Sequence, residues 1–296
     1  MSRSLTVQSI LYGNEPQAIV RAAEATANSA RLARADDLIG EWTLAIGDCS
    51  PTPVFDAESA AEIETLVTEA GGVFSYTVFG ENLGHGGGHN RLAPLTSSDL
   101  ILILNPDAQV GPDTIGRLAD TVRGDVALAD GRQLPLEHPK DYDPVTGDES
   151  WASGACSMTV RSVFEEVGGF DHETFFMYCD DVDYSWRVRL AGHRVVFAPS
   201  ARVFHDKRLT TDADIIPTSA EIYYSAEAAV FLAYKYSRQD LVNKILTAFR
   251  NEPDDVYRRV VAAYDERVAS GTLPQPLDSL GKVAQFINGN YAEHRY

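Results

Sequence analysis

Residues 100–107 read Leu-Ile-Leu-Ile-Leu-Asn-Pro-Asp, and this stretch fixes the architecture of the chain. Five apolar residues in a row predict a strand at Leu100–Leu104 that is buried on both faces of a covered sheet. Pro106 ends the strand, so Asp107 projects from the sheet edge at which open α/β sheets bind ligands. A carboxylate in that place can hold a divalent ion. As an isolated tripeptide, Asn-Pro-Asp is also a common turn.

On both sides of this strand the chain alternates strand-like and helix-like stretches, which is the pattern of an α/β sheet. Further strands are expected at Leu5–Tyr12, Trp42–Ile46, Val73–Val78, Val126–Ala129, Arg194–Pro199 and Ala201–His205. Helices are expected at about Ala18–Ala35, Ala57–Ala70, Pro112–Val122, Arg161–Val167 and Asp181–Leu190. Two loops are expected as well. One is the glycine-dense Gly84–Asn90, and the other is residues 135–150, which we expect to lie over a site.

The last third of the chain has a helical pattern. Helices are expected at Ser219–Phe249 and Pro253–Ser270, followed by a short end segment. A boundary near residues 206–218 therefore divides the chain into an α/β domain, residues 1–205, and a helical extension, residues 206–296.

One helix of this extension carries an apolar stripe. Tyr223, Ala226, Val230 and Ala233 follow helical spacing, so the helix should pack an apolar face on a neighbour. We expect that neighbour to be the core of the same chain. The alternative is a second subunit, which would make the protein a homo-oligomer through its C-terminal helices.

The charge balance argues against a nucleic-acid partner. The chain has 25 basic and 43 acidic residues, a net charge of −18. Binding to nucleic acid rests largely on Lys and Arg that neutralise phosphates, and this surface would repel them. A nucleotide ligand remains compatible with the charge, because one metal ion and a few backbone N–H groups can hold a diphosphate locally.

Cysteine usage and the N-terminus indicate the compartment. Cys49, Cys156 and Cys179 are widely spaced and include no CxxC pair, which argues against a disulfide framework and a zinc site and fits a reducing cytoplasm. The N-terminus lacks the features of a signal peptide, and no apolar run approaches the ~20 residues of a membrane span. The sequence therefore predicts a cytoplasmic protein that is soluble or, at most, peripheral to the inner face of the membrane.

Three carboxylates cluster at the start of a predicted helix. Asp180, Asp181 and Asp183 follow the aromatic-rich segment Phe175–Tyr178. A single Asp there would be explained by helix capping. Three within four residues are more than a cap requires, and repulsion between close carboxylates raises the proton affinity of at least one of them. Such a group can act as a general base near neutral pH.

Other candidates are weaker when each is taken alone. Asp48 follows a strand, but Gly-Asp-Cys-Ser-Pro also favours a turn, and that interpretation is the better one for an isolated Asp. His205 ends a strand, where a lone His is more often a packed or surface residue; beside a carboxylate it would suit Mn²⁺. The glycines of Gly84–Gly88 let backbone approach a ligand, but they form neither a dinucleotide-binding fingerprint nor a P-loop.

Taken in order, these segments resemble the family 2 glycosyltransferases with the GT-A fold, particularly the rhamnosyl- and galactofuranosyl-transferase-like branch. The resemblance covers roughly residues 5–205. It is carried by Glu-Asn-Leu-Gly-His-Gly-Gly-Gly-His-Asn at 81–90, Leu-Asn-Pro-Asp at 104–107, Trp-Ala-Ser-Gly-Ala at 151–155, Gly-Gly-Phe-Asp at 168–171, Phe-Phe-Met-Tyr at 175–178 and Asp-Asp-Val-Asp at 180–183.

The resemblance implies an α/β fold with a mostly parallel central sheet flanked by helices and a helical C-terminal tail. It implies an inverting sugar transfer from a nucleotide-sugar donor, a dTDP- or UDP-sugar, to a hydroxyl of a glycan, a lipid-linked glycan or a protein. In that reaction Asp181 is the general base beside Asp180, and Mn²⁺ or Mg²⁺ is held by Asp107 and His205. The donor-binding residues implied are Tyr12, Asp48, Asn82, Gly84, Asn90 and Asp107.

The sequence also departs from the family pattern. Asn105 replaces the first Asp of the metal motif, so the ion would rest on Asp107, His205 and the diphosphate, and Asp180 stands where many members have Glu. The rival hypothesis is a catalytically inactive GT-A protein that binds nucleotide sugar or acts as a scaffold in a polysaccharide assembly complex. A nucleotidyltransferase would carry a basic phosphate loop near the N-terminus, and Leu5–Pro16 contains no Lys or Arg. The donor sugar, its nucleobase and the acceptor stay open.

Overall fold

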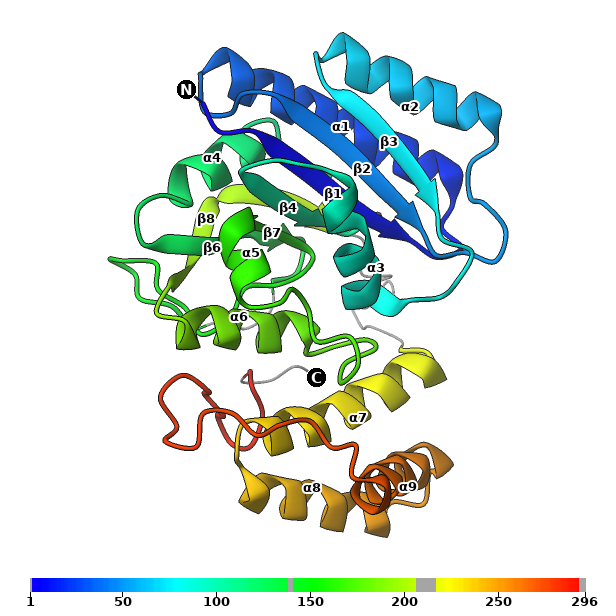
Figure 1. Ribbon diagram of the computed structural model, residues 1–296, viewed down its shortest axis with the longest axis vertical. Helices are drawn as coiled ribbons and strands as arrows, with labels where there is room; N and C mark the ends of the chain where they lie inside the picture. The colour runs from blue at the N-terminus through cyan, green and yellow to red at the C-terminus, as the bar shows by residue number, and fades with distance from the viewer. Residues whose placement is uncertain (1, 138–140, 206–216, 293–296) are drawn as a thin grey trace.

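A computed structural model describes residues 2–137, 141–205 and 217–292 of the chain. Its centre is an eight-stranded sheet in the order β3-β2-β1-β4-β7-β6-β8-β5 (Figure 1). The strands are β1 Leu5–Leu11, β2 Trp42–Asp48, β3 Val73–Val78, β4 Leu100–Leu104, β5 Ala108–Val110, β6 Val126–Leu134, β7 Cys156–Val160 and β8 Arg194–His205. The helices are α1 Pro16–Ala35, α2 Ala57–Glu69, α3 Gly84–Leu92, α4 Thr114–Thr121, α5 Arg161–Glu166, α6 Asp180–Leu190, α7 Ser219–Lys235, α8 Gln239–Asn251 and α9 Asp255–Ser270, with a 3-10 turn at Ala93–Leu95.

The sheet is mostly parallel, as expected. Strand β1 pairs in parallel with β2 and β4, β2 with β3, and β6 with β8. Strand β7 runs antiparallel between β4 and β6, and the short β5 runs antiparallel to β8. Parallel neighbours end at one edge of the sheet, so the loops that follow β1, β2 and β4 gather there.

The two faces of β4 explain its continuous apolar sequence. Leu100, Leu102 and Leu104 belong to the hydrophobic cluster formed with helices α1, α2 and α4. Ile101 and Ile103 belong to a second cluster, formed with helices α5 and α6. Because successive side chains point to opposite faces, every position of a strand covered on both sides must be apolar. All five residues are buried, which confirms the prediction for this strand.

A third cluster joins the C-terminal helices to α6. Val182 and Trp186 of α6 lie in one cluster with Val230, Phe231 and Tyr236 of the C-terminal region. Figure 1 shows α7 running beside α6, with α8 and α9 on the far side of α7. The apolar stripe of α7 therefore packs on the core of the same chain, as predicted.

Three expectations differ from the structure. The strands expected at Arg194–Pro199 and Ala201–His205 form one continuous strand, β8. The predicted single helix Ser219–Phe249 is broken into α7 and α8 at Ser237, whose φ is 59°, so the chain reverses and α8 packs on α7. The predicted loop Gly84–Asn90 is helix α3. The predicted boundary at residues 206–218 falls almost entirely outside the described residues, and the two-domain division stays a prediction.

Tight packing accounts for the helix at the glycine segment. A Cβ on Gly86 would lie 2.7 Å from the Cβ of Phe170, and one on Gly88 would lie 2.6 Å from Cγ2 of Ile10. Gly84 has a φ of +69° and sits against the carbonyl oxygen of Phe176. Each glycine disfavours a helix by about 1 kcal/mol relative to alanine. Here the glycines let α3 approach β1 and the segment before α6 closely, and that packing outweighs propensity.

Candidate active site

The three carboxylates of the acidic cluster point to three different partners. Oδ2 of Asp180 lies 2.6 Å from Nδ1 of His85. Asp183 is fully buried and accepts from Arg187 Nε at 2.8 Å, while Lys235 Nζ lies 2.6 Å from its Oδ1. Asp181 is the half-buried member of the cluster. The N-cap of α6 is Cys179, in a left-handed conformation, so all three Asp residues lie in the first turn of the helix and none stands at the N-cap.

Asp181 is held from two sides. Its Oδ2 accepts from the backbone N–H of Gly154 at 3.0 Å, and its Oδ1 accepts from the N–H of Val182 at 2.9 Å. Ser185 ties the same segment to α6, because its hydroxyl donates to the carbonyl of Asp181 and accepts from the N–H of Ala152. These bonds fix the carboxylate at the start of α6.

Residues 153–155 connect Asp181 to the end of β4. The hydroxyl of Ser153 accepts from Nε2 of Gln133 at 2.9 Å, and the carbonyl of Ala155 accepts from the N–H of Asn105 at 3.0 Å. Gln133 in turn contacts His205. Gly154 therefore bonds to α6, while Ser153 and Ala155 bond to Gln133 and Asn105, which lie near His205 and Asp107.

Asp107 and His205 lie together, as the metal prediction requires. Oδ1 of Asp107 is 3.4 Å from Nε2 of His205. The register of β5 on β8 brings them together, since Ala108 pairs with His205.

Both ring nitrogens of His205 have a side-chain partner: Gln133 lies at Nδ1, and Asn105 Nδ2 lies 3.4 Å from Nε2, where it can donate to the ring. Its Nδ1 lies 3.0 Å from Oε1 of Gln133, an acceptor, so Nδ1 carries the hydrogen and Nε2 keeps its lone pair on the side of Asp107. A protein partner on the second nitrogen is typical of metal-binding histidines. The pair therefore fits a divalent cation. Within the described residues no group of three or more His, Cys, Asp or Glu side chains is placed to hold a metal.

Asp48 lies at the end of β2, is buried, and accepts several hydrogen bonds through its carboxylate. Its carboxylate accepts from the N–H groups of Ser50 at 2.9 Å and Val54 at 2.7 Å, and from the hydroxyl of Tyr76. Burial acts to raise the pKa of Asp48, but these bonds, led by Ser50, outweigh it and lower the pKa. Burial and the bond to Asp48 raise the pKa of Tyr76 to about 12. The turn interpretation thus describes the local bonding of Asp48.

The remaining predicted donor residues lie around the same edge. Tyr12 follows β1 and is 56% exposed, and the next N–H, that of Gly13, donates to Ser50 Oγ at 2.9 Å. Asn82 accepts from the N–H of Gly84. Asn90 differs, because its amide exchanges two hydrogen bonds with the backbone of Phe170, at 2.7 and 2.9 Å. Its observed contacts hold the Gly-Gly-Phe-Asp segment against α3.

Solved structures share this architecture. A mannosyltransferase from Pyrobaculum calidifontis in complex with GDP-Man and Mn²⁺ aligns with 95% of this chain and 78% of its own, with a TM-score of 0.55 and 13% identity. GalNAc-T7 with UDP, GalNAc and Mn²⁺ aligns with 96% of this chain and 57% of its own, with a TM-score of 0.64 and 11% identity. At these identities the likeness establishes the fold, which is the GT-A fold of glycosyltransferases.

Sequence similarity identifies the branch. Over 206 residues the chain is 30% identical to the N-acetylglucosaminyl-diphospho-decaprenol L-rhamnosyltransferase of Mycobacterium tuberculosis. The chain is thus similar to the rhamnosyltransferase-like family 2 glycosyltransferases. The match spans 53% of this chain and 66% of the relative, just under two thirds of its length. No family model matches the sequence. Among the residues that the structure describes, no helix has the length and apolar character to cross a bilayer.

The structure adds His85 to the candidate site residues. The sequence places His85 in the glycine segment but gives no reason to pair it with Asp180, which lies 95 residues later. Burial acts to lower the pKa of His85, and the charge of Asp180 and the bond to it reverse this and raise the pKa. The one sequence feature that could have pointed to His85 is its place among the glycines of residues 84–88, which otherwise serve close packing.

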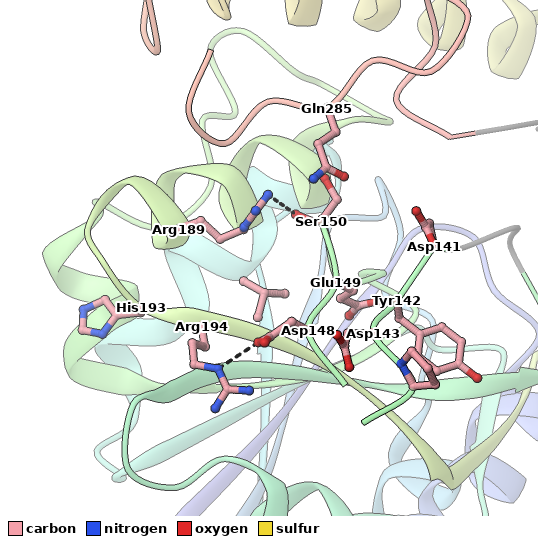
Figure 2. Close-up of a pocket in the computed structure, with 12 residues that line it drawn as sticks. Asp141, Tyr142, Asp143, Asp148, Glu149, Ser150, Arg189, His193, Arg194 and Gln285 are labelled. Carbon is pink, nitrogen blue, oxygen red and sulfur yellow. Dashed lines mark hydrogen bonds and ion pairs between the residues drawn. The ribbon is translucent and has the colours of Figure 1, made fainter. Parts of the chain in front are cut away.

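Part of the predicted loop at 135–150, namely residues 141–144 and 148–150, lines a cavity of about 690 Å³ together with Arg189 and Arg194 (Figure 2). Arg194 pairs there with Asp148 at 2.8 Å. Arg189 is in the last turn of α6, whereas Asp181 is in the first turn, so this cavity is at the opposite end of the helix.

Proposed function

We propose that the chain is an inverting glycosyltransferase that moves a sugar from a nucleotide-sugar donor to a hydroxyl acceptor. One observation carries the proposal: residues 153–155 join the half-buried Asp181 to the Asp107–His205 pair. A base on one side of the reacting carbon and a holder for the departing diphosphate on the other are the two parts that such a displacement needs.

Asp181 is the group proposed to accept the proton. As the acceptor oxygen attacks the anomeric carbon, the acceptor hydroxyl loses its hydrogen to the carboxylate, and the bond from that carbon to the diphosphate oxygen breaks. The bonds from Gly154 and Val182 hold the carboxylate, while its half-buried position leaves it open to an acceptor. Asp180 and Asp183 are buried and paired, which makes them poorer candidates.

Asp107 and His205 are the residues that would hold a divalent cation. The lone pair on Nε2 of His205 beside a carboxylate oxygen favours Mn²⁺ over Mg²⁺, because imidazole suits the softer ion. Such an ion supplies positive charge to the leaving diphosphate.

The donor and acceptor are proposed from the relatives' names and from the site. The similar Mycobacterium protein is named an L-rhamnosyltransferase acting on N-acetylglucosaminyl-diphospho-decaprenol, so rhamnose is the first sugar to test and a lipid-linked sugar diphosphate the first acceptor. The dTDP or UDP nucleoside would lie by Tyr12 and Asp48, where β1 and β2 end. Such an acceptor implies work at the inner face of the cytoplasmic membrane, with the protein peripheral to it.

One observation favours a second candidate. Asn105 occupies the first position of the metal motif, and a protein that has lost a ligand can keep donor binding without turnover. A nucleotide-sugar-binding scaffold in a polysaccharide assembly complex is therefore the alternative.

The two candidates are separated by binding and turnover together. Thermal shift with dTDP- and UDP-sugars, with and without Mn²⁺, selects the donor, because a ligand at a hundred times its Kd stabilises the fold by ~2.7 kcal/mol. Transfer to a lipid-linked acceptor is then followed, and NMR of the product gives its anomeric configuration. We expect inversion, loss of transfer in chelator and recovery with Mn²⁺. Tight donor binding without hydrolysis or transfer would establish the scaffold instead.

A further inference from the structure

His85 lies between the two segments that hold Asp181. From the first turn of α3, its Nδ1 is 2.6 Å from Oδ2 of Asp180, the residue directly before Asp181. On the other side, a Cβ built on Gly154 would lie 3.0 Å from Cε1 and 3.3 Å from Nε2 of His85. Gly154 is also the donor to Asp181. One imidazole ring therefore touches both supports of the proposed base.

The surroundings favour a charged ring at His85. Burial acts to lower the pKa of His85, but the charge of Asp180, the bond to Asp180 and the charge of Asp181 together raise it. The ring of His89 packs edge-on at 4.7 Å, and burial, followed by the charge of His85, keeps the pKa of His89 well below its ordinary value. The ring of Phe170, at 5.5 Å, brings no charge. Of the two histidines, His85 is the one whose pKa is shifted toward the charged form.

The second nitrogen of His85 lacks a protein partner. Nε2 is buried and, within residues 2–137, 141–205 and 217–292, makes no hydrogen bond. In the charged ring this nitrogen bears a hydrogen, and a buried donor without an acceptor is costly. His89 is the useful comparison, because its Nδ1 faces Oε1 of Gln8 at 3.1 Å, as expected for a packed histidine.

We propose that His85 is a further substrate-binding residue, which holds Asp180 through Nδ1 and donates a hydrogen bond from Nε2 to a hydroxyl oxygen of the transferred sugar. The inference rests on the proposed function, since that function places the sugar beside Asp181.

Three substitutions separate the two bonds of the ring. His85→Asn keeps a donor near the position of Nδ1, His85→Gln keeps one near Nε2, and His85→Phe removes both while keeping the ring. We expect kcat/KM to fall by about a hundredfold in His85→Phe and nearly as much in His85→Asn, with partial recovery in His85→Gln. His193→Gln is the matched control, since His193 forms an exposed pair with Glu166. It should transfer at the wild-type rate.

The pH dependence gives a readout that a packing role would not move. In wild type, kcat/KM should fall as the pH rises through the raised pKa of His85, and this alkaline fall should be absent from His85→Gln. If kcat/KM fell equally in His85→Gln and His85→Phe, or if the alkaline fall in kcat/KM persisted in His85→Gln, the proposed contact with the sugar would be overturned.

An NMR titration of the His85 ring tests the inference without relying on turnover. In protein labelled with ¹⁵N at histidine, the ring shifts of His85 should report a charged ring at neutral pH, and Asp180→Asn should lower its pKa. A neutral His85 in wild type would overturn the inference whatever the variants do. If the wild type itself shows no transfer to any acceptor, the proposed function fails, while this titration still decides the state of His85.

Discussion

The backbone nitrogen of Gly154 lies 3.0 Å from Oδ2 of Asp181, a residue 27 positions further along the chain. An added Cβ at Gly154 would lie 3.0 Å from Cε1 of His85, which is a tight contact, and 3.5 Å from Cβ of Asp181, which is an ordinary one. The hydrogen bond joins the segment that follows the predicted loop to the start of α6, and it sets where the proposed base stands.

Gly154→Ala should therefore impair turnover more than stability. The methyl group would crowd the His85 ring, so the ring or the Gly154 backbone that donates to Asp181 must shift by a few tenths of an ångström, and such a displacement beside a reacting group should cost about ten- to hundredfold in kcat. Gly111→Ala is the control, since its Cβ meets the Arg202 carbonyl at a similar 3.2 Å, at the end of β5. Both variants should lose stability to a similar extent in urea unfolding. Equal kcat values for the two would contradict the account.

Gln133 should control metal affinity without touching the metal. Gln133→Leu removes the acceptor that keeps the hydrogen of His205 on Nδ1, so Nε2 would no longer be reserved as a ligand. We expect Mn²⁺ to bind about 10- to 100-fold more weakly, measured by titration calorimetry with donor diphosphate present. The exposed Gln239, changed in the same way, should leave the affinity as it is. Unaltered Mn²⁺ binding in Gln133→Leu would show that this bond has no part in metal binding.

Lys235 should link the C-terminal helices to the proposed catalytic helix. Its Nζ lies 2.6 Å from both Asp171 and the fully buried Asp183 of α6. Lys235→Met would leave Asp183 with less compensation for its buried charge, and breaking a buried pair typically costs about 3–5 kcal/mol. Urea unfolding measures the loss, and Lys244→Met, at an exposed position of α8, is the control. Stability within about 1 kcal/mol of wild type would contradict a structural role for this pair.

The sequence predicted best what depends on neighbours in the chain. The strand Leu100–Leu104 follows from five apolar residues in a row, and the apolar face of α7 follows from its spacing. The glycine segment was misassigned because local propensity opposes a helix there, and only packing against Phe170 and Ile10 reverses the balance. Strand β5, with three residues, and β7 carry too little pattern to be seen, and the break at Ser237 has no Pro or Gly to signal it.

In the site, too, contacts between residues far apart in the chain could not be predicted from the sequence pattern. Asp107 and His205 were paired by resemblance to a family, and the structure places them 3.4 Å apart. Contacts such as His85 with Asp180, and Gln133 with His205, join residues 95 and 72 positions apart, and no periodicity encodes them. The catalytic and donor-binding roles of the predicted residues stay predictions.

The central claim is that Asp181 is the base, and transfer by Asp181→Asn tests it most directly. The amide keeps the size of the side chain and can still accept from Gly154, but it cannot take a proton. We predict that kcat falls by ~10²–10⁴ while donor and Mn²⁺ affinities stay near wild type, and that Asp180→Asn loses clearly less. Near-normal transfer by Asp181→Asn, or an inactive Asp180→Asn beside an active Asp181→Asn, would contradict the account.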